Sequence, residues 1–150
     1  MSKNNHILSK GQSINENYKV TFFLKKGSYA ETYRIKDQAG KTKLLKLFAY
    51  SKLNRTQFDA NGDVLEIQVL KKIKHPNLVK YCDSGELLLD GQKYAYAILD
   101  FISGETLADK LKREESINPY EAKDIVSGVL NGLNYLHSLQ SPSELIADYG

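Results

Sequence analysis

The residues best suited to chemistry in this sequence are a lysine and a glutamate set among apolar neighbours. Lys46 lies in the apolar run KLLKLF, and Glu66 opens the stretch EIQVLKK. An ammonium group in such surroundings requires a carboxylate or a phosphate as partner, because an unpaired buried charge is costly. Lys46 therefore predicts a carboxylate or phosphate partner, and the sequence by itself does not identify which one. The alternative is that each lies on an exposed face of its own element.

A single glycine upstream raises a related question. Gly27 lies within FLKKGSYAETYRIKD, residues 23–37, between two runs that alternate apolar and polar residues as strands do. A loop with little side-chain bulk brings backbone N–H groups close to phosphate oxygens. The stretch is either a plain hairpin turn or a lid over phosphate, and by itself it does not distinguish the two.

The rest of the sequence predicts the elements that must position these groups. Residues 1–17 are polar and aperiodic, so we expect a flexible leader, with structure beginning near Tyr18. Periodicity and turn residues then predict the order βββ-α-ββ-α-α. Strands are expected at 18–26, 30–37, 42–49, 78–89 and 92–101, and helices within 54–76, 104–114 and 118–139.

Local signals define the ends of these elements. Asp63 is a possible N-cap of the first helix, and Asn118 followed by Pro119 suits the start of the last one. The pair Asp90 and Gly91 suits the turn of a hairpin. The last helix carries an apolar stripe formed by Ile125, Val129, Leu133 and Leu136.

Composition narrows the functional classes. The 150 residues, 41% of them hydrophobic, are enough for one ordinary domain core. A net charge of +3, from residues of both signs in mixed order, gives no sign of a nucleic-acid or membrane partner. Cys82 is the single cysteine, and no Cys/His cluster has zinc spacing, which suits a cytoplasmic location. The first residues lack the apolar core of a signal peptide.

Four stretches of the sequence can be compared with known motifs: KLLK at 43–46, EIQVLKKIKHPNLVKY at 66–81, YAILDFISGETLADKL at 96–111 and GVLNGLNYLHSL at 128–139. With them, the chain from about residue 18 to 139 resembles the small lobe of a eukaryotic-type Ser/Thr protein kinase and the first two helices of its large lobe. The resemblance implies an α+β fold, with a five-stranded antiparallel sheet, one packed helix and two large-lobe helices. The implied parts are a flexible leader (1–17), a small lobe with hinge (18–102), two large-lobe helices (103–139) and an irregular tail (140–150).

The resemblance also assigns roles by position. Lys46 matches the lysine that bridges the α- and β-phosphates of ATP, and Glu66 matches the carboxylate paired with it, so these two are the expected catalytic residues. Leu99 matches the gatekeeper before a hinge of Asp100, Phe101 and Ile102. The Gly-x-Gly-x-x-Gly-x-Val loop matches Lys25, Gly27, Ala30 and Thr32. The implied nucleotide-binding set is Leu24, Gly27, Thr32, Leu44, Lys46, Leu99, Asp100 and Ile102.

The sequence departs from the family pattern in two places. Leu44 replaces the small alanine that lies against adenine, which would crowd the pocket, and one of three loop glycines remains. No His-Arg-Asp-x-x-x-x-Asn loop is present, since residues 138–147 alone separate His137 from Asp148 and that region would take roughly two dozen residues. The final Asp148, Tyr149 and Gly150 are either a remnant of the Asp-Phe-Gly motif, with Asp148 as Mg²⁺ ligand, or a coincidence.

Three hypotheses follow. The chain is a truncated protein kinase-like domain that binds ATP and Mg²⁺ without phosphotransfer, because the catalytic loop is absent. Alternatively, it is a non-catalytic, pseudokinase-type protein interaction module, which the crowded pocket would favour. A third reading is a gene fragment with no stable fold of its own. The apolar faces of the last two helices would lack cover, so a protein partner or self-association is expected.

Overall fold

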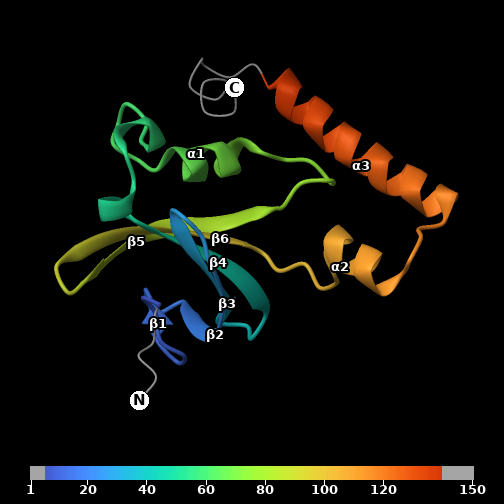
Figure 1. The fold of residues 1–150 in the computed structure, drawn as a ribbon. Coiled ribbons are helices and arrows are strands. Elements are labelled where there is room, and N and C mark those ends of the chain that lie inside the picture. The colour runs from blue at the N-terminus through green and yellow to red at the C-terminus, as the bar shows by residue number, and fades with distance from the viewer. Residues whose placement is uncertain (1–5, 140–150) are drawn as a thin grey trace.

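The computed structural model describes residues 6–139, in which six antiparallel strands form one sheet (Figure 1). The strands are β1 (Ser13–Ile14), β2 (Tyr18–Lys26), β3 (Ala30–Lys36), β4 (Thr42–Ala49), β5 (Tyr81–Leu89) and β6 (Gln92–Asp100), in the spatial order β1-β2-β3-β4-β6-β5. The helices are α1 (Leu65–Lys72), α2 (Leu107–Arg113) and α3 (Pro119–Ser138), with 3-10 turns η1 (Tyr50–Lys52) and η2 (Arg55–Gln57). The predicted order is confirmed, and β1 is an additional strand.

The two faces of the sheet bury different residues, because side chains alternate along a strand. One face is covered by α1, where Val64 and Ile67 pack on Phe48, Ala97 and other residues of β4 and β6. The opposite face carries the larger core. That core consists of Leu8, Ile14, Val20, Tyr33, Ile35, Leu45, Leu47, Tyr96 and Ile98.

The segment before β2 closes this second core, so the prediction that structure begins near Tyr18 is wrong. Leu8 and Ile14 are completely buried. The Leu8 N–H donates to the Tyr33 hydroxyl at 3.0 Å, and the Ile7 N–H donates to the Glu31 carboxylate at 2.9 Å. The few apolar residues of this segment are irregularly spaced, so no periodicity revealed them. The sheet therefore has six strands where five were expected.

The segment between β4 and α1 also differs from the prediction. Residues 54–63 form turns, and α1 begins only after Val64, which is its N-cap and makes no side-chain capping bond. Asp63 is therefore not the N-cap. The Asp59 carboxylate accepts the N–H groups of Asn61 and Asp63, both at 2.9 Å, which stabilises a turn where the helical pattern had suggested a frayed first turn.

Two other local signals are confirmed. Asp90 and Gly91 both have positive φ, at 50° and 78°, as a tight β5–β6 turn requires. Asn118 caps α3, because its side chain accepts the Tyr120 N–H at 2.8 Å, and Pro119 is the first helical residue.

Small residues let α3 approach the loop that follows α1. A Cβ added to Gly128 would lie 3.1 Å from the Asn77 amide, and one added to Gly132 would lie 3.3 Å from Leu78. One turn further, the Tyr135 hydroxyl accepts the Lys74 N–H at 3.0 Å. The long helix is thus fixed to the sheet part through the 74–78 loop. No helix within residues 6–139 is both long enough and apolar enough to cross a membrane.

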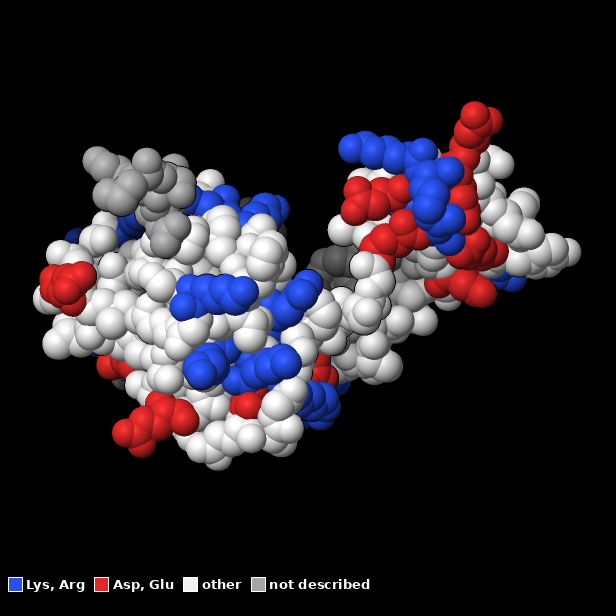
Figure 2. Space-filling model, turned by 90° about the horizontal axis from the view of Figure 1, so that it is seen from below, with Lys and Arg blue, Asp and Glu red and all other residues white. Residues whose placement is uncertain are grey.

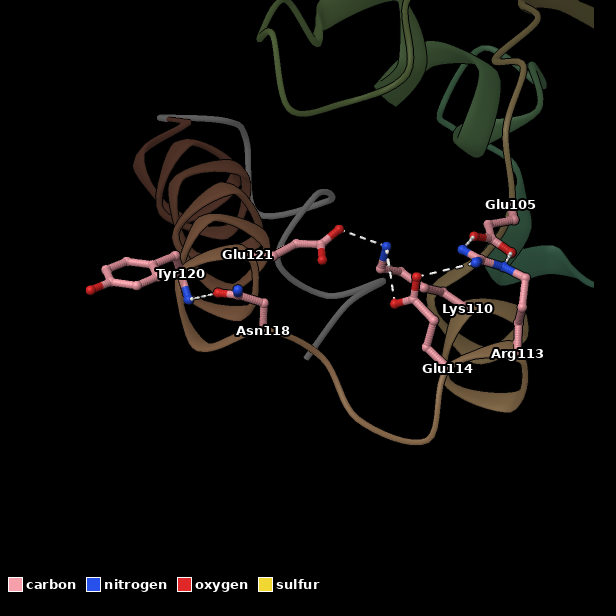
Figure 3. A network of polar contacts seen from close by, with 7 residues as sticks. All are labelled: Glu105, Lys110, Arg113, Glu114, Asn118, Tyr120 and Glu121. Carbon is pink, nitrogen blue, oxygen red and sulfur yellow. Dashed lines mark hydrogen bonds and ion pairs between the residues drawn. The ribbon is translucent and has the colours of Figure 1, made fainter.

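Ion pairs connect α2 to the start of α3 (Figure 3). The Lys110 ammonium lies 2.6 Å from Glu121 of α3 and 3.5 Å from Glu114, while Arg113 bridges Glu114 and Glu105. Exposed pairs contribute little one by one, and their main effect here is to set the orientation of the two helices. Figure 2 shows both charge signs interleaved over this helical part, whereas Lys and Arg gather on the sheet part of the same face.

The buried position of Leu8 gives a direct test of the closed second core. We expect Leu8→Ala to lower the free energy of unfolding by about 3 kcal/mol, because it removes apolar contacts and leaves a cavity. The matched control is Leu88→Ala, at a leucine that is 73% exposed, which should change stability by less than about 0.5 kcal/mol. Urea unfolding of both variants measures the difference. Equal, small effects would contradict the packing of residues 6–17 on the sheet.

Candidate functional site

Lys46 and Glu66 meet on the α1 face of the sheet. Side chains alternate along β4, so Lys46 points to this face while its neighbours Leu45 and Leu47 point to the opposite core. Glu66 lies in the first turn of α1. The distance between Lys46 Nζ and Glu66 Oε2 is 2.6 Å. The Oε2 atom itself is shielded from solvent, and within the described chain the ammonium is its partner. The alternative of two unrelated exposed side chains is therefore wrong.

A cavity of about 610 Å³ lies beside this ion pair. The β2–β3 hairpin, β4, the segment around η2 and the start of α1 enclose it. Four residues of the predicted site are on its wall, namely Gly27, Thr32, Lys46 and Glu66. The other lining residues are Lys25, Ser28, Tyr29, Ala30, Phe48, Leu53, Asn54, Thr56, Gln57, Val64 and Leu65.

The turn at Gly27 is a closed hairpin at the rim of the cavity. The Gly27 N–H donates to the Ala30 carbonyl oxygen at 2.8 Å, so it is engaged within the turn. A Cβ at Gly27 would lie 3.2 Å from that same oxygen, which explains why a glycine suits the position. The N–H groups of Ser28 and Tyr29 form no hydrogen bond with other residues in the 6–139 range. The stretch is thus a hairpin that still presents two backbone donors.

The remaining apolar residues of the predicted site do not line this cavity. Leu44 is half-buried against the α1-side core and pairs in register with Leu99, which is 5% exposed. Leu24 and Ile102 are 37% and 73% exposed. The structure therefore brings together the predicted phosphate-end residues and leaves the predicted adenine-end residues outside the cavity.

The Asp100 side chain is bonded to the strand beside it. The Lys43 ammonium donates to Asp100 Oδ1 at 2.8 Å, and the Cys82 thiol lies 3.2 Å from the same oxygen. The hydrogen bond from Lys43 lowers the pKa of the Asp100 carboxyl, and the same bond raises the pKa of Lys43. The Asp100 backbone N–H is engaged as well, since it donates to the Lys80 carbonyl oxygen at 2.9 Å.

Several cavity residues were missed by the sequence interpretation. The wall formed by Leu53, Asn54, Thr56 and Gln57 was assigned to a helical region. One signal was present, because Asn54 and Gln57 have the spacing of a capping box, which marks the start of a short helical turn.

The predicted metal ligand, Asp148, lies outside the described residues, as does the predicted irregular tail. Between residues 6 and 139 there is no group of three or more His, Cys, Asp or Glu side chains that could hold a metal ion. Mg²⁺ therefore has no assigned protein ligand in this part of the chain.

Curated relatives with similar sequences are serine/threonine-protein kinases. The probable serine/threonine-protein kinase fhkD of Dictyostelium discoideum is 27% identical over 134 residues, which cover 85% of this chain and 17% of that protein. Serine/threonine-protein kinase 1 of Arabidopsis thaliana is 29% identical over 119 residues, 77% of this chain and 13% of that protein. The probable kinase PknB of Bifidobacterium longum is 27% identical over 128 residues, 81% of this chain and 18% of that protein. The chain thus spans less than a fifth of each of these relatives.

A family model is matched over most of the chain. Residues 18–141 match the protein kinase domain, and this range contains strands β2–β6, helices α1–α3 and both members of the ion pair. The predicted small lobe with its packed helix, followed by the first large-lobe helices, agrees with this match. The chain therefore belongs to the protein kinase domain family.

Proposed function

We propose that this chain binds ATP at the cavity beside Lys46 and Glu66. The single observation that carries the proposal is the Lys46–Glu66 ion pair at 2.6 Å on the wall of a cavity of about 610 Å³. In protein kinases this lysine and glutamate must be paired for the lysine to contact the nucleotide phosphates. Membership of the family makes a nucleotide the expected occupant of such a cavity.

The phosphate end of the cavity suits a polyanion. Its lining carries two ammonium groups, from Lys25 and Lys46, and one carboxylate, from Glu66, which is already paired. Thr32 and the free N–H groups of the hairpin turn add neutral donors. A charged phosphate accepts several such bonds at once, and these are stronger than bonds between neutral groups. When bound with the nucleotide, Mg²⁺ would neutralise part of the phosphate charge.

The adenine end is the tighter part of the proposed site. Leu44 lies in register with Leu99 and packs on the α1-side core, and neither Leu44, Leu99 nor the hinge residue Ile102 lines the cavity. We infer that adenine binding requires Leu44 to change its rotamer, which lowers affinity. ATP binding should consequently depend more on the phosphates than on the base.

Phosphotransfer by residues 1–150 is not part of the proposed function. Protein kinases place the acceptor hydroxyl with an aspartate from the catalytic loop, and no such loop follows His137 in this sequence. Positioning of the reactants provides much of the rate enhancement. We therefore expect nucleotide binding without detectable transfer to a protein substrate.

An ATP titration of wild type and Lys46→Ala tests the site. We expect saturable binding by the wild type, strengthened by Mg²⁺, and at least about 10-fold weaker binding by Lys46→Ala, since a charge-assisted contact is lost. Lys112→Ala is the matched control, because it removes the same charge from exposed α2 and should bind like the wild type. Calorimetry on folded proteins measures all three.

Absence of ATP binding by a folded wild type would contradict the proposal. Equal affinity of wild type and Lys46→Ala would place the nucleotide elsewhere. Transfer of phosphate that disappears in Lys46→Ala would show that the chain is an active kinase, against our expectation.

Leu44→Ala tests the tight adenine end. Removing the side chain should open space and raise ATP affinity by about 10-fold, as expected for a few methylene groups that obstruct a pocket. Tripolyphosphate, which has no base, should bind wild type and variant equally. An unchanged or lower ATP affinity in a variant that remains folded would show that Leu44 does not obstruct the base.

The second candidate function is a protein interaction module without nucleotide binding. The observation that favours it is the apolar surface of α3, where Val126, Val129, Leu130 and Leu133 are 44–59% exposed. Contiguous apolar surface of this kind is typical of contact sites. A folded wild type that does not bind ATP and that self-associates in sedimentation experiments would support this candidate over the first.

A further inference from the structure

We propose that the side-chain amides of Asn54 and Gln57 form a second phosphate-binding wall, opposite the Gly27 hairpin, and donate hydrogen bonds to the phosphates of the bound nucleotide. The inference rests on the proposed nucleotide binding and adds ligand contacts from the segment between β4 and α1. Both side chains line the same cavity as Lys25 and Lys46.

The orientation of both amides is fixed by the turn they belong to. Asn54 Oδ1 accepts the Thr56 N–H at 3.0 Å, and Gln57 Oε1 accepts the Asn54 N–H at 2.9 Å. A backbone N–H can only donate, so each amide must point its oxygen into the turn. Each NH₂ group is consequently directed away from the turn. The capping box thus turns two residues that can donate or accept into pure donors.

The composition of the cavity favours an anion at these donors. Among its fifteen lining residues the one acidic side chain is Glu66, whose charge is engaged by Lys46. Lys25 leaves one positive charge without a counter-charge on the lining. Asn54 and Gln57 both line this space, and an NH₂ group directed into it finds a charged acceptor in a phosphate ligand.

The donors of Asn54 and Gln57 would also compensate for backbone donors that the Gly27 hairpin lacks. In the family loop, close backbone contact with phosphate depends on glycines. Here Lys25 and Ala30 occupy two of those positions, and the Gly27 N–H is used by the Ala30 carbonyl. Donors from the opposite side of the cavity would supply contacts that this hairpin does not make.

The capping box permits variants that remove the donors and keep the fold. Asn54→Asp and Gln57→Glu retain the oxygen that accepts the turn N–H, and both residue types suit their capping positions. Each replaces an NH₂ donor with a carboxylate oxygen. Asn54→Ser also keeps a capping oxygen but adds no charge, so it separates loss of the donor from repulsion.

The control for charge is Asn131→Asp, which makes the same substitution on an exposed residue of α3. Thermal unfolding of all four variants should agree with the wild type. Affinities for ATP, AMP and tripolyphosphate are then measured by calorimetry.

We expect Asn54→Asp and Gln57→Glu to weaken ATP and tripolyphosphate binding by about 10-fold or more, and Asn54→Ser by about 3- to 10-fold. AMP, whose single phosphate lies nearest the base, should be affected least. Asn131→Asp should bind as the wild type does.

Other results overturn the inference in distinguishable ways. If the wild type binds ATP and the Asn54 and Gln57 variants bind it equally well, the second wall is wrong while the proposed function stands. Equal weakening by Asn131→Asp would reduce the effect to net charge and also overturn it. If the wild type binds neither ATP nor tripolyphosphate, the inference fails together with the proposed function.

Discussion

The contact between Lys46 and Glu66 is the constraint on which the site depends, because it joins β4 to α1 on the wall of the cavity. Helix α1 has eight residues and no side-chain N-cap, so its intrinsic stability is low and its position comes from tertiary contacts. Val64 and Ile67 anchor it to the sheet through apolar packing, which is strong but not directional. The ion pair adds a directional polar contact between α1 and β4, on the wall of the cavity.

The two ends of the cavity region differ in character. In the proposed ATP site, the side meant for the phosphates is lined by donors from three separate segments, whereas Leu44 and Leu99, on the side meant for adenine, pack together outside the cavity. The first arrangement agrees with the family pattern, in which this lysine and glutamate are paired, and both side chains are partly exposed, at 34% and 41%. In the second arrangement Leu44, where the family has a small alanine, packs on the α1-side core. The intact charge pair therefore lies beside a proposed base site in which we expect less room.

Sequence reasoning succeeded where a short-range signal had one physical meaning. The Asp90 and Gly91 turn, the Asn118 cap and the alternation around Lys46 all depend on neighbouring residues, and all are found as predicted. It failed where tertiary contacts decide. Leu8 is buried because it packs in one core with Tyr33, 25 positions away, whose hydroxyl also accepts its N–H, and nothing local to Leu8 indicates this. The Asn54 turn was included in the stretch 54–76 expected to hold one helix with Asp63 as its possible N-cap, and its own capping box was not recognised.

The segment that covers the second face of the sheet lies outside the range matched by the protein kinase family. The homologous unit, residues 18–141, begins after Leu8 and Ile14, yet both are among the most deeply buried side chains of the core. A protein cut at the homology boundary would leave Ile35, Leu45 and Ile98 without their partners and present a sheet face to solvent. The packed unit of this kinase family member thus extends beyond the N-terminal end of the family match, as far as the buried Leu8.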